Sequence, residues 1–463
     1  MNSIPDTDWE MWFPKIIQGG MGAFVSGWRL ARKVSGYSAT GETLGVVSGT
    51  ALDRVVAILL QRGGKDADDI IRVLMASHFP EKADRVIQKY HKKLNVGIPV
   101  SDLNNDPNQH LRDLLFCANY AVVKLAQEGH DNPVGINYLA KVPEPLLAGL
   151  YGAVSAGVGY VLIWAGIATE VPEMLRAFSR GERAIHKIPI IGGPDYTMEL
   201  EPEKFLGTEP PLLKKPRFWP ITSYTAIATK FEKKPDDTDL YIVENKQAAG
   251  HNAPPRKRPQ PEWQEEKDID EIISHEKPVY LAGNQASREK YLAARARGAQ
   301  GVQVGTAFAF CDDSEFEEWL RRKARRMAYN QELEIKTDPL ASPTKFLFKV
   351  AQIPWTQSEE IVRETRDRAC SACALRVPLQ KGEKIAYQCP AGPEQDFKDN
   401  GGDPEDLKGK VCLCNALLCA VDLVDDIPIV TAGNTDLVRG LMDGPDGSYT
   451  AEDVIRAILP QPE

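Results

Sequence analysis

Apolar and polar positions follow two repeating patterns along this chain. Short apolar runs indicate buried strands, and most are followed by stretches with apolar residues three and four apart, as in amphipathic helices. The predicted strands are KIIQGG (15–20), TLGVVSG (43–49), PVGINYL (133–139), YVLIWAGI (160–167), IHKIPIIGG (185–193), DLYIVEN (239–245), PVYLAGN (278–284) and GVQVGTAF (301–308). Eight strands that alternate with helices favour a closed (β/α)8 TIM barrel over an open doubly wound α/β sheet.

The predicted barrel carries additional segments. Residues 51–132 hold extra helical material between the second and third strands, and residues 194–238 form a Pro-rich excursion between the fifth and sixth. Both leave from the carboxyl ends of the strands, where barrel active sites lie, so either is a candidate lid. The βα pattern stops after about residue 330. We therefore expect a barrel over residues 1–340 and an extension over 341–463 that ends in the helix AEDVIRAIL.

One uncharged run has the length of a membrane span. Residues 145–169 carry no charged side chain, which is enough chain to cross a bilayer as a helix. The GVG at 157–159 divides the run into a predicted buried helix (146–156) and a predicted buried strand (160–167). A lone central segment without basic flanks is a weak indication of a span. We therefore expect no membrane association.

Composition and charge narrow the function classes. The chain has 463 residues, 43% hydrophobic and 26% charged, as in ordinary globular proteins. A net charge of −9 argues against nucleic-acid binding, which requires a basic face. The first residues show no basic stretch followed by an apolar run, and eight cysteines are too few for a disulfide scaffold. We expect a cytoplasmic protein with reduced thiols.

Glycines gather at the carboxyl ends of four predicted strands. IIQGGMG ends the first strand, VSGT the second, LAGNQAS the seventh and VGTAF the eighth. In a barrel these ends share one rim, where glycine allows close approach of a ligand and exposes backbone N–H donors. Ser287 is the predicted N-cap of the helix after the seventh strand, and barrels frequently hold phosphate at the seventh and eighth loops. The pattern predicts a phosphorylated cofactor.

His251 directly follows the sixth predicted strand, behind Ala248, Ala249 and Gly250. An imidazole at this rim suits a catalytic base or a substrate contact, and a satisfied structural histidine is the alternative. The remaining histidines do not lie at catalytic strand ends and are interpreted as surface or structural: His78, His91, His110, His130, His186 and His275.

Several motifs together resemble the nitronate monooxygenase family, formerly called 2-nitropropane dioxygenases. They are "PKIIQGGMG", "LGVVSGTALD", "AAGHNAPPR", "LAGN" and "GVQVGTAFAF", in this order over about residues 12–312, and the resemblance continues through "DPLASPT" and "KVCLCNALL". The resemblance implies an FMN-dependent barrel enzyme related to FMN-dependent enoyl-acyl-carrier-protein reductases. The implied reaction oxidises alkyl nitronates with O2 to a carbonyl compound and nitrite. A histidine with a pKa near physiological pH would form the nitronate from a nitroalkane.

The resemblance also assigns roles to individual residues. It places Gln18, Gly19, Gly20 and Met21 along the isoalloxazine ring, and Asn137 against the flavin or its ribityl chain. It places Ala249 and Gly250 near the flavin, makes His251 the catalytic residue, and assigns the 5′-phosphate to Gly283, Asn284, Gly305 and Thr306. The chain departs from the family pattern at Ala249 and Asn284, where glycine is usual. Asparagine accepts a positive φ better than most residues.

The cysteines of the extension leave a second question open. Cys370, Cys373, Cys389, Cys412 and Cys414 include close pairs that suit zinc or an iron–sulfur cluster, but their spacing matches no motif we can name. The apolar setting of VCLCNALLCA favours buried, reduced thiols, so we expect no bound metal. Cys117 and Cys311 are interpreted as core residues.

Two alternative functions remain. One is an FMN-dependent NAD(P)H enoyl-thioester reductase, and the other is a non-catalytic flavin- or metal-binding module. The sequence has no G-x-G-x-x-G fingerprint after a strand, which only weakly disfavours nicotinamide, because many FMN barrels bind it without that motif. The expected partners are O2 and a small anionic or nitro substrate. The basic RKRP (256–259) is interpreted as a solvated loop, and cover of an anionic substrate is the alternative. The sequence does not indicate the oligomeric state.

Overall fold

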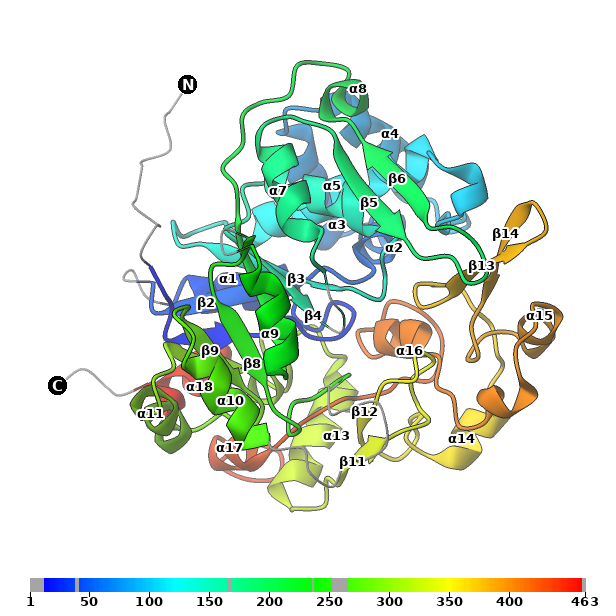
Figure 1. Cartoon of the computed structure of the whole chain (residues 1–463). Coiled ribbons are helices and arrows are strands. Elements are labelled where there is room, and N and C mark those ends of the chain that lie inside the picture. Colours follow the sequence, from blue (N-terminus) through cyan, green and yellow to red (C-terminus); the bar gives the residue numbers. More distant parts are fainter. Residues whose placement is uncertain are drawn as a thin grey trace.

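The chain folds around a closed barrel of parallel strands (Figure 1). The computed structural model describes residues 12–37, 41–164, 166, 168–234, 237–251 and 265–459. Within these ranges the strands follow one another around the barrel as β1 (Ile16–Gln18), β2 (Thr43–Ser48), β3 (Val134–Leu139), β4 (Tyr160–Trp164), β7 (Arg217–Thr222), β8 (Tyr241–Glu244), β9 (Val279–Ala282) and β10 (Gly301–Val304), and β10 pairs with β1. The predicted (β/α)8 architecture is confirmed.

The fifth barrel strand is not the predicted one. Strand β7, RFWPIT, holds that place and pairs in parallel with β4 and β8. The predicted strand at 185–193 instead forms β5 (Ala184–Ile188), which pairs antiparallel with β6 (Tyr196–Leu200) outside the barrel. The prediction was wrong because Pro220 and the prolines before β7 indicated a loop. Nearly all of β7 is buried, whereas burial alternates along β5, as expected of a strand with one side facing solvent.

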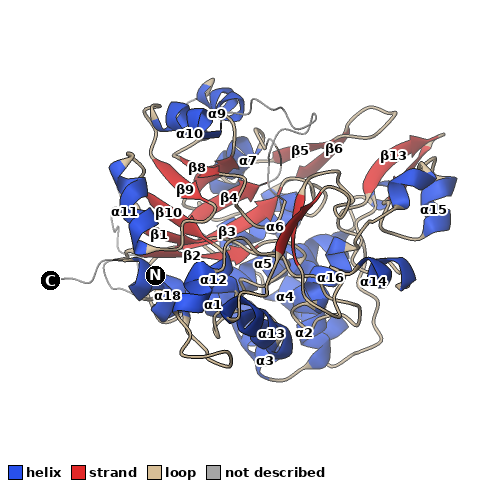
Figure 2. Cartoon of the chain, turned by 90° about the horizontal axis from the view of Figure 1, so that it is seen from below, coloured by secondary structure: helices blue, strands red, loops and turns tan. Residues whose placement is uncertain are grey.

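Helices surround the strands (Figure 2). The insertion between β2 and β3 contains α2 (Leu52–Arg62), α3 (Lys65–Met75), α4 (Pro80–Tyr90), η2 (Leu103–Asn105) and α5 (Gln109–Ala126). The other helices before residue 330 are α1 (Trp28–Ser35), α6 (Leu146–Ser155), α7 (Val171–Ser179), α8 (Pro202–Leu206), α9 (Thr225–Glu232), α10 (Glu265–Ile273), α11 (Arg288–Ala296), α12 (Thr306–Ala309) and α13 (Glu318–Tyr329). The helical periodicity read from the sequence is confirmed at α1, α2, α7, α11 and α13.

The uncharged run at 145–169 folds into α6 and β4, as predicted. Gly152 allows α6 to pack directly on α5, because a Cβ there would lie 2.2 Å from the carbonyl oxygen of Phe116. Residues 165 and 167 of the predicted strand lie outside the described residues. Across the described ranges, no helix combines the length and the apolar character needed to cross a bilayer.

The chain after α13 runs across the carboxyl-terminal rim of the barrel. It contains β11 (Ile335–Asp338), β12 (Phe348–Ala351), α14 (Glu360–Thr365), β13 (Val377–Lys381), β14 (Lys384–Gln388), α15 (Glu394–Asp399), η4 (Pro404–Leu407), α16 (Leu413–Cys419), α17 (Asp436–Gly440) and α18 (Ala451–Ile458). The β13–β14 hairpin lies beside β6 (Figure 1), and Ile191 N donates to Pro378 O (3.1 Å). Asn104 of η2 and Ile385 exchange two hydrogen bonds. The predicted lid at 51–132 therefore contacts the extension, and so does the turn just before the predicted lid at 194–238.

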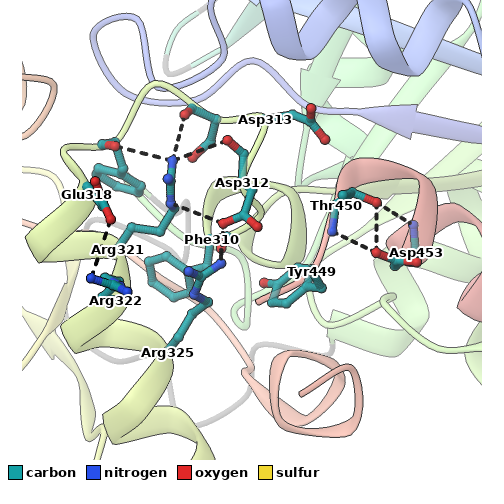
Figure 3. A network of polar contacts seen from close by, with 12 residues as sticks. Phe310, Asp312, Asp313, Glu318, Arg321, Arg322, Arg325, Tyr449, Thr450 and Asp453 are labelled. Atoms are coloured by element: carbon teal, nitrogen blue, oxygen red, sulfur yellow. Dashed lines mark hydrogen bonds and ion pairs between the residues drawn. The ribbon is translucent and has the colours of Figure 1, made fainter. Parts of the chain in front are cut away.

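Helix α18 is fastened to the barrel through a polar network (Figure 3). Thr450 caps the helix in a capping box. Arg325 of α13 donates to Asp312 (2.7 Å), whose backbone N–H donates to the carbonyl of Tyr449 (2.8 Å). The Tyr449 hydroxyl donates to the carbonyl of Ala307 on α12 (2.9 Å). The end of the extension thereby holds the short helix that begins at the barrel rim.

Candidate functional site

Two connected cavities lie at the carboxyl ends of the barrel strands. The larger, about 170 Å³, is bounded on one side by the extension, and we call it the apolar chamber. Its apolar walls include Leu139, Val142, Trp164, Phe348, Leu375, Leu413 and Leu417. The smaller, about 110 Å³, is the glycine chamber, lined by Gly19, Gly20, Gly283, Gly305 and Gly433 among others. The chambers share lining residues on β1, β8 and β10 loops, so they form one site with an apolar end and a backbone-lined end.

Nearly all residues predicted from the resemblance line these chambers. Of these predicted residues, five line both chambers: Gly20, Met21, Ala249, Gly305 and Thr306. Asn137, Gly250 and His251 line the apolar chamber, and Gly19, Gly283 and Asn284 line the glycine chamber. Gln18 lines neither. Its side chain is fully buried, with Oε1 accepting from Val46 N (3.1 Å) and Nε2 donating to Val46 O (3.2 Å). The side-chain amide of Gln18 therefore ties β1 to β2 instead of facing either chamber.

The turn after β9 has a backbone that few residue types adopt easily. Gly283 has a φ of +92° and Asn284 a φ of +55°, so asparagine is accommodated as expected. A Cβ at position 283 would lie 2.0 Å from Asn245 Oδ1 and 3.0 Å from Ala248 N. Asn245 is held in place, because its Oδ1 accepts from Gln247 N (2.9 Å) and its Nδ2 donates to Gly283 O (3.0 Å). The β8 and β9 turns are therefore locked together.

The extension completes the glycine chamber in a way that sequence analysis missed. Gly433 N donates to Thr306 Oγ1 (2.8 Å), which brings the 429–434 segment over the β10 loop. The tripeptide AGN occurs twice, at 282–284 and at 432–434, and both copies reach this chamber. That repetition is the signal that would have identified it. Ser287 caps α11 as predicted, with its side chain accepting from the backbone of the third helical residue.

His251 is buried at the edge of the apolar chamber, with 7% of its surface exposed. Its ring lies edge-on to Phe348, with centroids 4.9 Å apart. Burial, with a smaller contribution from the Lys141 ammonium, lowers the pKa of His251 to about 3. The expected pKa near physiological pH is therefore wrong for this arrangement, and the imidazole is neutral. The motif residues after His251, and RKRP at 256–259, lie outside the described residues.

Ser342 fixes the orientation of that imidazole. Ser342 Oγ lies 2.7 Å from His251 Nε2. The same oxygen accepts a hydrogen bond from Thr344 N (3.2 Å). Ser342 is fully buried. It belongs to the quoted motif DPLASPT, but sequence analysis gave it no role. The contact joins the extension to the histidine of the barrel rim, so the extension is part of the site.

Three side chains at the site bury a polar atom that has no hydrogen-bond partner among the described residues. These atoms are Asn137 Oδ1, Glu244 Oε2 and Gln303 Oε1, and all three side chains line the apolar chamber. Leaving such an atom unpaired costs about 1–3 kcal/mol. A bound heterocycle with its own donors and acceptors would remove that cost. The sequence analysis identified only Asn137 of this group.

Glu244 is the most informative of the three. It ends β8 and is 9% exposed, and it lines both chambers. Burial raises the pKa of Glu244 well above its usual range, which favours the protonated carboxyl. In that form it donates one hydrogen bond and does not repel an anion. A carboxylate that ends the apolar run DLYIVE was the available sequence signal.

The histidines interpreted as structural lie outside both chambers. His110 Nε2 contacts Tyr90 Oη (2.9 Å), and His130 Nε2 contacts the carbonyl oxygen of Ala126 (3.0 Å). His186 Nδ1 contacts Glu170 Oε2 (2.9 Å), and the residue lies on β5 instead of opening a barrel strand. These contacts agree with structural roles.

The cysteines differ in exposure. Cys117 and Cys311 are buried in the core, as predicted. In the extension Cys412 and Cys419 are buried, whereas Cys370, Cys373, Cys389 and Cys414 are partly exposed, so full burial was wrong for these four. The chain segments that the structure describes contain no group of three or more His, Cys, Asp or Glu side chains arranged to hold a metal ion.

Comparison with models of known protein families gave no match, and a sequence search among curated proteins also gave none. Among solved structures, FabK from Thermotoga maritima is 15% identical with a TM-score of 0.47, covering 96% of this chain and 91% of that one. Nitroalkane oxidase from Streptomyces ansochromogenes is 13% identical with a TM-score of 0.47, covering 97% and 95%. The enoyl reductase domain of MlnA from Bacillus amyloliquefaciens is 10% identical with a TM-score of 0.38, covering 74% and 64%. Likeness at this level does not transfer a substrate or a cofactor between proteins.

Proposed function

We propose that this protein is an FMN-dependent oxidoreductase that oxidises alkyl nitronates or nitroalkanes with O2. The observation that carries the proposal is the group of unpaired buried polar atoms on Asn137, Glu244 and Gln303, which line a cavity beside His251. Other unpaired polar atoms occur among the described residues, but these three line one cavity, which supports a shared partner bound there.

The residues present fit FMN. Asn137, Glu244 and Gln303 would hold the polar edge of the ring, and the glycine chamber would hold the phosphate. Among the residues that the structure describes, the glycine chamber is lined by neither lysine nor arginine, so within this part of the chain backbone N–H and amide groups would bind the phosphate. A neutral Glu244 would not oppose it. Bound FMN supplies the redox centre that these side chains lack.

The apolar chamber favours a small acidic substrate with an apolar chain. Its walls are leucine, valine and aromatic side chains from both the barrel and the extension. A neutral His251 can accept a proton from the α-carbon of a nitroalkane, while Ser342 holds the ring at Nε2. The anion formed beside the imidazolium would raise the pKa of His251, and the Lys141 charge favours the same anion.

Anaerobic mixing tests the proposal. We expect the purified protein, reconstituted with FMN, to lose flavin absorbance on mixing with propionate 3-nitronate, and to yield a carbonyl product and nitrite on admission of O2. An enoyl-thioester reductase is the second candidate, because an acyl chain would also suit the apolar walls. Rapid bleaching by NADH, without bleaching by the nitronate, would identify that activity. If the protein binds flavin but neither reagent reduces it, the protein would instead be a non-catalytic flavin-binding module.

Glu244 gives a separate prediction about flavin binding. Glu244→Gln keeps a hydrogen-bond donor of similar shape and removes the titrating group, so we expect FMN affinity within about threefold of wild type near pH 7. The folded pKa of Glu244 is raised, so the carboxyl ionises only as pH rises. Wild-type FMN affinity should therefore fall with increasing pH, because the carboxylate repels the phosphate, and the variant should lose that dependence. Fluorescence titration of FMN between about pH 6 and about pH 9 measures both. Parallel pH profiles for the two proteins would exclude the role.

A further inference from the structure

Two cysteines of the extension lie close enough for covalent chemistry. Cys370 Sγ and Cys373 Sγ are 3.1 Å apart, about 1 Å farther than bonded disulfide sulfurs. They belong to a turn that leads into β13, in which Cys373 has a φ of +52°. Both residues are partly exposed, whereas Cys412 and Cys419 are buried. Small reagents can therefore reach this pair.

The turn that carries the pair is fixed to helix α16. Asn415 Oδ1 accepts from Ser371 Oγ (3.0 Å) and from Ala372 N (3.1 Å), and Asn415 Nδ2 donates to Ala369 O (3.3 Å). These bonds hold the chain just before Cys370 and between the two cysteines. The sulfurs can then approach each other by side-chain rotation without rebuilding the turn.

The two thiols are not equivalent. The contact with Cys370 Sγ, together with the positive charges of Arg376 and Arg54, holds the pKa of Cys373 below its usual range. The same contact and burial raise the pKa of Cys370. Since the thiolate is the attacking species in exchange reactions, Cys373 is the nucleophile of the pair.

We propose that Cys370 and Cys373 form a reversible redox pair that exchanges with an external disulfide. The Cys373 thiolate attacks one sulfur of that disulfide, forms a mixed disulfide and releases one thiolate. Cys370 then gives up its proton and attacks Cys373 Sγ, which closes the internal disulfide and releases the second thiolate. The protein loses two electrons and two protons, and the external disulfide becomes two thiols.

The pair also borders the candidate active site. Ala374 and Leu375, which follow Cys373 directly, line the apolar chamber, as does Cys414 of α16. Formation of the disulfide would therefore shift the chamber wall through Ala374 and Leu375. The redox chemistry itself does not depend on flavin or on the proposed oxidation, so it can be tested separately.

Thiol mapping over a series of redox buffers tests the pair. The full-length protein is equilibrated without oxygen at varied ratios of oxidised to reduced dithiothreitol, quenched in acid, alkylated and mapped by mass spectrometry, and its zinc content is measured. We expect loss of two of the eight thiols, a link between Cys370 and Cys373, and full recovery in reduced dithiothreitol. Cys370→Ser and Cys373→Ser should each abolish the link, and Cys419→Ser should keep it.

Wild-type protein alone also decides the question if a serine variant fails to fold. Near pH 7, Cys373 should be alkylated about tenfold faster than Cys389, because more of it is thiolate. Eight free thiols at every ratio, or a link between other cysteines, would overturn the proposal. Zinc bound to these cysteines, and required to leave before oxidation, would overturn it as well and identify a metal site instead.

Discussion

Replacement of His251 by alanine is expected to keep FMN bound and to slow turnover of neutral nitroalkanes by about a hundred- to ten-thousand-fold. In the proposed reaction the imidazole would be the neutral proton acceptor, and its Nε2 is held by Ser342 at the edge of the apolar chamber. With a nitronate formed in advance, no proton has to be removed, so the loss should be much smaller. Stopped-flow rates with a nitroalkane and its nitronate give the ratio.

The pH profile offers an independent check of the same residue. Burial lowers the pKa of His251 to about 3, so the imidazole stays unprotonated as pH falls from neutrality toward that value. The kcat/KM for nitroalkanes should therefore show no loss from His251 protonation between about pH 8 and about pH 5. An inflection near pH 6.5 that disappears in the alanine variant would contradict the low pKa.

A matched histidine provides the control. His186 lies on β5 and contacts Glu170, and neither residue lines a chamber. His186→Ala should leave the nitroalkane-to-nitronate rate ratio at the wild-type value. If His251→Ala also retains that ratio and its rate, then the imidazole is not the base.

Gly283→Ala is expected to have the largest effect on cofactor binding. The positive φ of +92° strains any residue with a Cβ, by about 1–3 kcal/mol. The added carbon would meet Asn245 Oδ1 at 2.0 Å and Ala248 N at 3.0 Å. Relief requires Asn245 to leave the bonds that lock the β8 and β9 turns. We expect FMN affinity to fall at least about tenfold, together with a lower Tm.

Gly382→Ala is a control that introduces the backbone strain of a Cβ at positive φ without the steric clash expected for Gly283→Ala. Gly382 also has a positive φ, +61°, but a Cβ there meets nothing within 4 Å, and the residue lies in the β13–β14 hairpin. This variant should bind FMN as wild type does and lose only a small amount of stability. Isothermal titration with FMN and thermal melting compare the two variants directly. Equal FMN affinity in both would remove the phosphate role assigned to the β9 turn.

Much of the barrel could be predicted because its strands are local apolar runs. Strands such as β3 and β9 are buried on both faces, so nearly every position is apolar and visible in a short window. Apolar runs did not identify β7, because Pro220 lies inside this buried strand. They wrongly indicated that β5 is a core strand, because it contains isoleucines. Whether such a run enters the barrel depends on its pairing partners, which lie far away in the chain.

Some features of the candidate site could also be predicted from the sequence, and others could not. Glycine motifs at strand ends predicted that Gly283 and Gly305 meet, and they line one chamber because β9 and β10 are neighbours. The direction of the Gln18 side chain could not be predicted, because a strand-end amide can point to a ligand or, as here, to a neighbouring strand. Glu244 was missed, since its protonation follows from burial that no local pattern reveals.

The sequence by itself determined the repeating βα units, the glycine turns and the histidine at the rim, because these depend on residues close together in the chain. Only the tertiary structure decided that residues 342–434 cover the barrel mouth, where Ser342 meets His251 and Gly433 meets Thr306. It also decided the direction in which burial shifts the pKa of each of His251 and Glu244: down for the imidazole and up for the carboxyl. Both outcomes arise from long-range packing, which removes these side chains from water and sets their hydrogen-bond partners.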